Sequence, residues 1–317
     1  MPQILKPARL SLDPDPVTLE RATADRSWTP QHAAGRPRRR SARARAGAWV
    51  LLGCTALSTA GAQGQYANPD AGRPLPIEDA YAIERYALDL HLAPLGAEWG
   101  RGRRATWGLS PEATYGLLPR TQVALALPVA SRRGNGDRVE LEGVNLSALH
   151  TFNVETEGMP ALGLRASALI PVGGAGPDRL ESTLRAIATR SLPWARVHVN
   201  AAYTFGTDSG AGEFRRLASG DALGSRWQWG VALDRALPLH ATLLGLSASV
   251  AEPPGRRGSR ELTVMGGARV QAAPQWTLEA SLGRRLTGPA PAWLASVGIA
   301  RIVSVNIPRP GVGRWGS

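Results

Sequence analysis

The 317-residue sequence has a single cysteine, Cys54, and it falls within a stretch that we interpret below as a removable leader. After removal of that leader, the chain can form no internal disulfide bond and has no thiolate to bind a metal. From Tyr66 onward the sequence also lacks a run of about 18 uninterrupted apolar residues, which a membrane-spanning helix requires. A transmembrane β-strand needs only about 9–11 residues with one apolar face, so these absences do not exclude a membrane protein built from strands.

Recognisable catalytic motifs are also missing. The sequence has no G-x-S-x-G elbow, no phosphate-binding P-loop and no H-E-x-x-H zinc motif. We therefore predict no catalytic residues, no metal site and no cofactor. One pair, His198 and Asn200, invites comparison with a barrel-embedded lipid hydrolase that uses serine, histidine and asparagine, and this reading stays open as an alternative.

The formal charge of +12 suggests nucleic-acid binding at first sight. However, residues 1–62 contain ten Lys and Arg against four Asp and Glu, a net of +6, so half of the excess precedes the predicted mature start. In the remainder, arginines alternate with acidic residues, whereas a nucleic-acid-binding protein concentrates its basic residues on one face. We predict no nucleic-acid partner.

The N-terminal region reads as a secretory signal. Six arginines between Arg36 and Arg45 precede an apolar stretch, Ala46 to Ala60, and Ala60-Gly61-Ala62 fits a cleavage site. We predict a signal peptide over residues 36–62, with lipidation of Cys54 in a lipobox-like Leu51-Leu52-Gly53-Cys54 as the alternative. Residues 1–35 are polar and proline-containing, and we predict a disordered extension or a start site placed too early.

Alternation of apolar and polar residues dominates the sequence from Arg85 onward, as in β-strands with two different faces. Residues 195–206 show it most clearly: Val197, Val199, Ala201, Tyr203 and Phe205 alternate with Arg196, His198, Asn200, Ala202 and Thr204. Five short turns, near residues 119, 159, 193, 238 and 274, separate strand pairs that longer Gly-rich loops join on the other side. This rhythm is typical of a transmembrane β-barrel.

We predict an all-β fold: an antiparallel, transmembrane up-and-down β-barrel of about twelve strands over residues 84–303. Residues 63–83 show no strand alternation and contain Pro69, Pro74 and Pro76, so they are expected to form a loosely ordered periplasmic lead-in. Residues 304–317 form a C-terminal tail. Two strands, 182–192 and 292–303, have apolar residues on the polar face, and their register could slip by one.

The predicted faces give two groups of residues. The inner face should carry a lumen lining, in which charges tune selectivity or pair with one another: Asp89, His91, Arg165, Arg196, His198, Asn200, Arg226, Asp234, Glu261, Arg269 and Glu279. Aromatic residues near strand ends should form girdles at the membrane interfaces: Trp99, Trp107, Tyr203, Phe205, Trp227, Trp229, Trp276 and Trp293.

Two segments carry a family resemblance. Arg73-Pro-Leu-Pro-Ile-Glu-Asp-Ala80 and Leu109-Ser-Pro-Glu-Ala-Thr-Tyr-Gly-Leu-Leu118 resemble outer-membrane proteins of the phenol-degradation meta-pathway transporter family. The resemblance implies a barrel that passes hydrophobic or aromatic compounds. The sequence departs from the usual pattern of such barrels in one respect. Bacterial barrels commonly finish on an aromatic residue that the assembly machinery reads, whereas this sequence continues beyond Asn306 as a tail.

Together these patterns predict a bacterial outer-membrane protein that acts as a passive, porin-like channel or transporter for small solutes, and the resemblance implies that these are hydrophobic or aromatic. Its expected partners are outer-membrane lipid, the solute and the barrel-assembly machinery. A structural barrel without transport is the other alternative.

Overall fold

The computed structural model describes residues 73–92, 95–100, 105–132, 138–172, 176–206, 225–237, 240–253, 258–288 and 291–304. The predicted leader, the start of the predicted lead-in and the tail after residue 304 lie outside this part of the chain. Within it, no helix is long and apolar enough to cross a membrane.

Sixteen β-strands form within the described ranges, and all of them belong to one sheet. They are β1 (Ala87–His91), β2 (Leu95–Trp99), β3 (Thr106–Leu109), β4 (Glu112–Leu118), β5 (Thr121–Ala126), β6 (Val129–Arg132), β7 (Arg138–Leu141), β8 (Val144–Asn153), β9 (Ala161–Ile170), β10 (Glu181–Ser191), β11 (Arg196–Phe205), β12 (Trp227–Leu237), β13 (Thr242–Ala251), β14 (Glu261–Ala273), β15 (Trp276–Arg285) and β16 (Ala292–Ser304).

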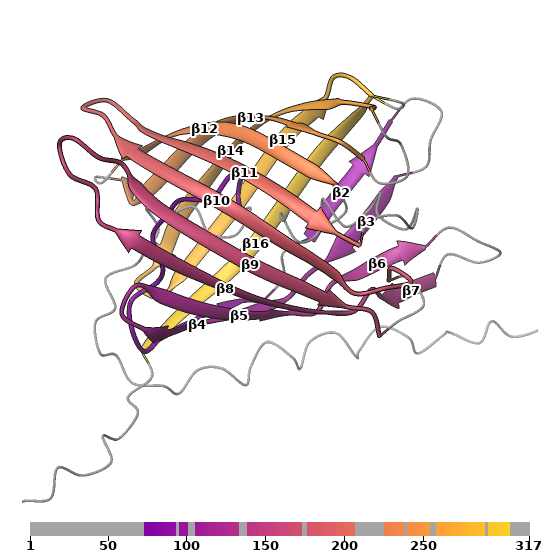
Figure 1. Cartoon of the computed structure of the whole chain (residues 1–317), viewed down its shortest axis with the longest axis horizontal. Helices are drawn as coiled ribbons and strands as arrows, with labels where there is room; N and C mark the ends of the chain where they lie inside the picture. Colours follow the sequence, from indigo (N-terminus) through magenta and orange to yellow (C-terminus); the bar gives the residue numbers. More distant parts are fainter. Residues whose placement is uncertain are drawn as a thin grey trace, which may run out of the picture. The chain divides into compact units, whose positions relative to one another are not determined.

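The first eight strands form four interrupted crossings, β1 with β2, β3 with β4, β5 with β6 and β7 with β8, since only two or three residues separate the members of each pair. These four crossings and the eight strands from β9 to β16 make twelve. Neighbouring strands pair antiparallel around the ring, and β1 pairs with β16, which closes the barrel (Figure 1). The prediction of a twelve-stranded antiparallel barrel is confirmed.

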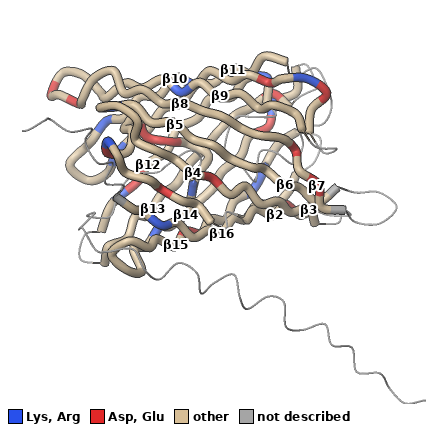
Figure 2. Tube along the Cα trace, turned by 90° about the horizontal axis from the view of Figure 1, so that it is seen from below, with Lys and Arg blue, Asp and Glu red and all other residues tan. Residues whose placement is uncertain are grey.

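The two faces of each strand differ as the alternation predicts. On β9, Gly163, Arg165 and Ser167 are buried, whereas Leu164 and Ile170 are exposed on the outside. Large apolar side chains cover the outer wall in the same way on the other long strands, for example Leu246 on β13 and Leu282 on β15. A wall that is apolar outside and polar inside suits a barrel surrounded by lipid. Acidic and basic positions are interspersed over the strands (Figure 2).

Residues 73–83 do not form a loosely ordered lead-in, so that expectation is wrong for the described part of the segment. They run along the inner wall of the barrel before β1 begins (Figure 1, indigo), and we call them the belt. Leu75, Ile77, Ala80 and Ile83 are almost completely buried. Prolines and the absence of alternation suggested a loop, but a segment held by side chains of the wall needs no strand periodicity of its own.

The belt also explains the two strands of doubtful register. On β10, Ile187 points inward because it packs against Ala80, in a cluster with Leu149 and Ala161. On β16, Leu294 points inward and joins a cluster with Leu75, Ile77, Ala232 and Met265. Both strands pair continuously with their neighbours over the residues concerned. The apolar residues on the polar face therefore form a small core under the belt.

Candidate lumen site

A buried ion-pair cluster lies at the middle of the belt. The Glu78 carboxylate is bonded by two arginines on adjacent strands. Arg165 of β9 places Nη2 at 2.8 Å from Glu78 Oε2, and Arg185 of β10 places Nη1 at 3.0 Å from Oε1. The side chains of all three residues are at most 3% exposed. Charges at this depth must be paired to be tolerated, so Glu78 ties the belt firmly to the wall.

Side chains of the wall, rather than strand pairing, bond the backbone of the belt. The N–H of Glu78 donates to Asn200 Oδ1 at 3.0 Å, and Asn200 Nδ2 donates back to the Glu78 carbonyl at 2.9 Å. The N–H of Ile83 donates to Gln122 Oε1 at 2.7 Å. Thr151 Oγ1 both accepts from the N–H of Ala82 and donates to the carbonyl of Ala80. These polar residues bond the backbone of the belt between Glu78 and Ile83, which pairs with none of the sixteen strands.

A relay of three side chains supports the belt at Ala80. The N–H of Ala80 donates to Thr189 Oγ1 at 2.9 Å, and this hydroxyl lies 3.0 Å from His198 Nδ1. His198 Nε2 lies 2.9 Å from Asp234 Oδ2 and must carry its proton, because the carboxylate can only accept. Arg196 donates two hydrogen bonds to the same carboxylate. A hydroxyl, an imidazole and a carboxylate are thus in line, but the hydroxyl is already engaged by the belt.

The first residue of the belt enters a second charged cluster. Arg73 Nη2 lies 2.8 Å from Glu112 Oε1 of β4, and its Nε lies 3.9 Å from Glu279 Oε1 of β15. Arg269 donates to the Arg73 carbonyl and to Glu279. Nearby, His91 lies 3.2 Å from Asp89. Acidic and basic groups alternate here, so the cluster is internally paired.

Small residues on the wall leave room for the apolar part of the belt. A Cβ built on Gly245 of β13 would lie 2.6 Å from Leu75 Cδ1, too close for any real contact. The next nearest atoms to this Cβ, Leu233 O and Leu75 Cγ, are both 3.6 Å away. A Cβ on Gly230 of β12 would likewise lie 2.7 Å from Ile77 Cδ1. At Gly245 the belt alone limits the side chain, through the end of Leu75. At Gly230 the wall limits it as well, because Ala248 O and Ser249 Cβ would both lie 2.8 Å from the Cβ.

The predicted lining residues lie on the inner side of the wall, but they do not all meet. Those that gather around the belt are Asp89, His91, Arg165, Arg196, His198, Asn200, Asp234, Arg269 and Glu279. Arg226 lies just before β12, 4.0 Å from Glu252. Glu261 lies 3.5 Å from Arg285, which also forms a two-point bond with Glu98. That these residues contact a solute stays a prediction.

Sequence reasoning missed several members of these clusters: Glu78, Arg73, Arg185, Thr189, Glu98 and Arg285. Arg185 lies on β10, one of the two strands whose register the sequence left doubtful. One feature of the sequence could have revealed them. An arginine and an isoleucine both point inward on β10, which indicates that something other than water covers the inner face.

The predicted girdle residues lie at the strand ends. Trp99, Trp107, Tyr203, Phe205, Trp229 and Trp293 are exposed on the outer wall, and Trp227 and Trp276 are half-buried. Trp227 differs from the rest, because its indole N–H donates to Glu252 at 2.6 Å. Arg301 lies over the Trp276 ring.

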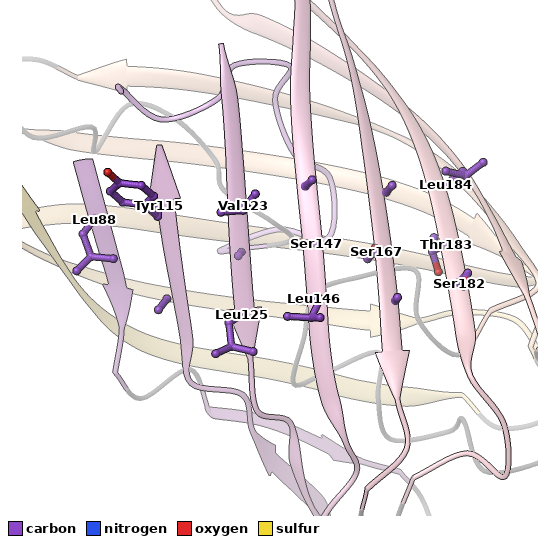
Figure 3. A pocket seen from close by; sticks show the side chains of 15 residues that line it. Leu88, Tyr115, Val123, Leu125, Leu146, Ser147, Ser167, Ser182, Thr183 and Leu184 are labelled. Atoms are coloured by element: carbon purple, nitrogen blue, oxygen red, sulfur yellow. The ribbon is translucent and has the colours of Figure 1, made fainter. Parts of the chain in front are cut away.

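A groove of about 680 Å³ crosses the outside of the wall, from β1 to β10 (Figure 3). Side chains in two rows, each running across neighbouring strands, line the groove. In one of them, Tyr115, Val123, Ala148, Ala166 and Leu184 stand side by side on β4, β5, β8, β9 and β10. Alanines at the centre of the row make the hollow, and larger side chains flank it. The groove faces the lipid side of the wall and is separate from the belt.

Within the described ranges, no group of three or more His, Cys, Asp and Glu side chains could hold a metal ion. No family model matches the sequence, and no curated protein matches it either.

Several solved structures match 68% to 71% of this chain. An outer-membrane channel from Pseudomonas putida F1 is 16% identical, with a TM-score of 0.47 over 71% of this chain and 98% of that chain. The KdgM porin is 11% identical, with a TM-score of 0.44 over 68% of this chain and 98% of that chain. The translocator domain of the autotransporter NalP from Neisseria meningitidis is 12% identical, with a TM-score of 0.40 over 69% of this chain and 89% of that chain. The twelve antiparallel strands, closed by β1 and β16 and covered outside by apolar side chains, give this chain the fold of the bacterial outer-membrane β-barrels.

Proposed function

We propose that the chain is a passive outer-membrane channel for small solutes, whose free cross-section is set by the belt. The observation that carries this proposal is the way the belt is held. Between Glu78 and Ile83 its backbone bonds to side chains of the wall, and the ring of strands closes through β1 and β16 without it. A segment of this kind restricts a lumen that the twelve strands enclose on their own.

The polar inner wall supports transport over a purely structural role. A barrel that only anchored the chain could be filled with apolar side chains, whereas here arginines, carboxylates and amides line the inside. In channels such charges tune selectivity. The family resemblance implies hydrophobic or aromatic solutes, and we keep that class as part of the proposal. The charged wall makes small polar solutes the necessary comparison.

The burial of the relay argues for a channel over a hydrolase. Thr189, His198 and Asp234 are each at most 3% exposed, and the Thr189 hydroxyl accepts from the belt backbone. A nucleophile in that position has no room for a lipid ester. We therefore assign the relay to support of the belt.

We further propose that the short turns face the periplasm, the long loops face outward, and the barrel-assembly machinery inserts the chain. Secreted chains reach the outer membrane from the periplasm, and single-chain bacterial barrels have short periplasmic turns. The predicted signal peptide supports this route.

Planar-bilayer conductance tests the channel, with Gly245→Val as the key variant. A Cβ at Gly245 would lie 2.6 Å from Leu75 of the belt and would meet no wall atom within 3.5 Å, so the valine should push against the belt rather than against the wall. Gly266→Val is the matched control, because a Cβ there meets only the Gly245 carbonyl oxygen, at 3.8 Å. We expect larger conductance for Gly245→Val than for the wild type and Gly266→Val. If none of the three folded barrels conducts, the channel proposal fails.

Liposome uptake then addresses the solute. Vesicles containing Gly245→Val should take up small solutes faster than vesicles containing Gly266→Val. Comparing phenol with a small sugar tests the solute class that the resemblance implies. Uptake of the sugar alone would overturn the aromatic solute and leave the channel standing.

A further inference from the structure

Two consecutive arginines at the end of β15 have opposite environments. Arg285 points inward, is buried, and bonds to Glu98 and Glu261. Arg284 points outward and is exposed, with its guanidinium carbon 5.3 Å from the centre of the Trp293 ring. Strand alternation alone separates them. The outward arginine therefore stands on the lipid side of the wall, beside the loop that follows β15.

The surroundings of Arg284 on the outer wall are aromatic and free of carboxylates. Arg284, Trp293 and Trp99 form a continuous cross-strand row on β15, β16 and β2, and Trp107 on β3 stands close to it. The acidic residues of β14, β15, β16 and β2 are Glu261, Glu279 and Glu98, and all three are buried inside. On these four strands the outer face thus presents a cation with no acidic side chain beside it.

The polar groups of the side chains in this row, and that of Trp107 beside it, are all hydrogen-bond donors. Arginine has five N–H groups and no acceptor, and an indole has one N–H and no acceptor. In the described part of the chain, the side-chain N–H groups of Arg284, Trp99, Trp107 and Trp293 donate to no protein acceptor. Trp227, by contrast, uses its N–H on Glu252. A patch composed only of donors is complementary to an anion.

The depth of Arg284 in the membrane determines which anions can reach it. Below Arg284 on the outer face of β15 come Leu282, Ala280 and Leu278, the apolar residues expected against acyl chains. An arginine facing lipid is tolerated near the interface and costs about 2–4 kcal/mol at the midplane. Trp293 and Trp99 occupy the interface level as well. At this level the anions available are the phosphates of lipid headgroups.

We propose that Arg284, Trp293 and Trp99 form a binding site for the phosphate of a lipid headgroup on the outside of the barrel. Arg284 bonds the phosphate oxygens, since a planar guanidinium matches phosphate in two-point bonds. Trp293 holds the guanidinium in place from beneath. This inference rests on the membrane placement given above. With the long loops outside, the lipid is the phosphorylated glycolipid of the outer leaflet.

Native mass spectrometry of the detergent-solubilised barrel tests the site, with lipid A and dephosphorylated lipid A as probes. We expect lipid A to bind more tightly, and Arg284→Gln to weaken that binding about ten-fold, the loss of one charged hydrogen-bonding group. Arg235→Gln is the control at the opposite, short-turn end of the barrel, because Arg235 is also exposed on the outer wall and lies over no aromatic ring of the described residues. Its binding should equal that of the wild type.

Three results would overturn the site: equal binding of the two probes, equal loss in Arg284→Gln and Arg235→Gln, or displacement of lipid A by inorganic phosphate. Gel mobility before and after heating shows that each variant is folded. Conductance is measured on the same preparations. Normal conductance without phosphate-dependent lipid binding removes this inference alone, whereas a barrel that stays out of membranes removes the proposed function with it.

Discussion

Arg165 and Arg185 lie directly opposite each other across β9 and β10, and both point inward to one carboxylate. Two like charges in facing positions of a sheet repel each other. Glu78 from the belt lies between them and converts the repulsion into two ion pairs. The pairing of these two strands is thus compatible with their charges only while the belt is in place.

Replacing Glu78 by Gln should destabilise the barrel strongly. The variant leaves two buried guanidinium groups without their shared carboxylate, and removing one partner of a buried ion pair costs about 3–5 kcal/mol. Urea unfolding in lipid vesicles, followed by tryptophan fluorescence, measures the loss. Adding Arg185→Gln to Glu78→Gln should recover part of it. A double variant no more stable than Glu78→Gln would contradict the shared role.

Replacing Thr189 by Val should loosen the belt at Ala80. Valine keeps the shape but leaves the N–H of Ala80 without its acceptor, at a cost of about 1–3 kcal/mol. Thr183→Val is the control, because Thr183 is also buried on β10 but bonds to Thr204 rather than to the belt. Both variants are compared by urea unfolding. If Thr189→Val and Thr183→Val lowered the free energy of unfolding equally, the Thr189 hydroxyl would stabilise only the wall and not the belt.

Burial of the belt can be measured by thiol labelling. In a Cys54→Ser background, a cysteine at Ala80, which is 0% exposed, should resist a water-soluble maleimide. A cysteine at Gly158, in an exposed turn with no atom within 4 Å of its Cβ position, should react readily. Adding Gly245→Val should speed labelling at position 80. Fast labelling at position 80 without that change would show that the belt leaves the wall spontaneously.

The outer wall should reject charge at its centre. Leu246 is 56% exposed near the middle of β13, where an arginine facing lipid costs about 2–4 kcal/mol. Leu246→Arg should therefore lower the free energy of unfolding in vesicles by that amount, while Leu246→Phe should leave it nearly unchanged. A Leu246→Arg barrel as stable as the wild type would place this face in water.

The sequence alone was sufficient to predict the wall. Alternation is local, so the opposite faces of His198 and Val199 could be read from neighbouring residues, and the strand count followed from the turns. The belt could not be found in this way. The bonds between Glu78 and Asn200 join residues 122 positions apart, and they leave no periodic trace in the belt.

The same reason explains why the candidate site was found only in part. Arg165 and Asn200 were recognised because they lie on clear strands. Their partner Glu78 lies between prolines and β1 and looked like loop. The inward Ile187 and Leu294 suggested a slipped register, because an inner face covered by another segment of the chain cannot be distinguished from an error of register by local pattern.

Arg73 stands where the two ends of the barrel meet. The closing pair, β1 with β16, joins only five residues on each strand. Arg73 reaches Glu112 on β4 and Glu279 on β15, the strands that flank this pair on either side. Arg73 therefore links the strands on the two sides of the β1–β16 pair. A chain trimmed to begin after residue 73 would lose these ion pairs and would close less stably at this pair, even though every strand would still be present.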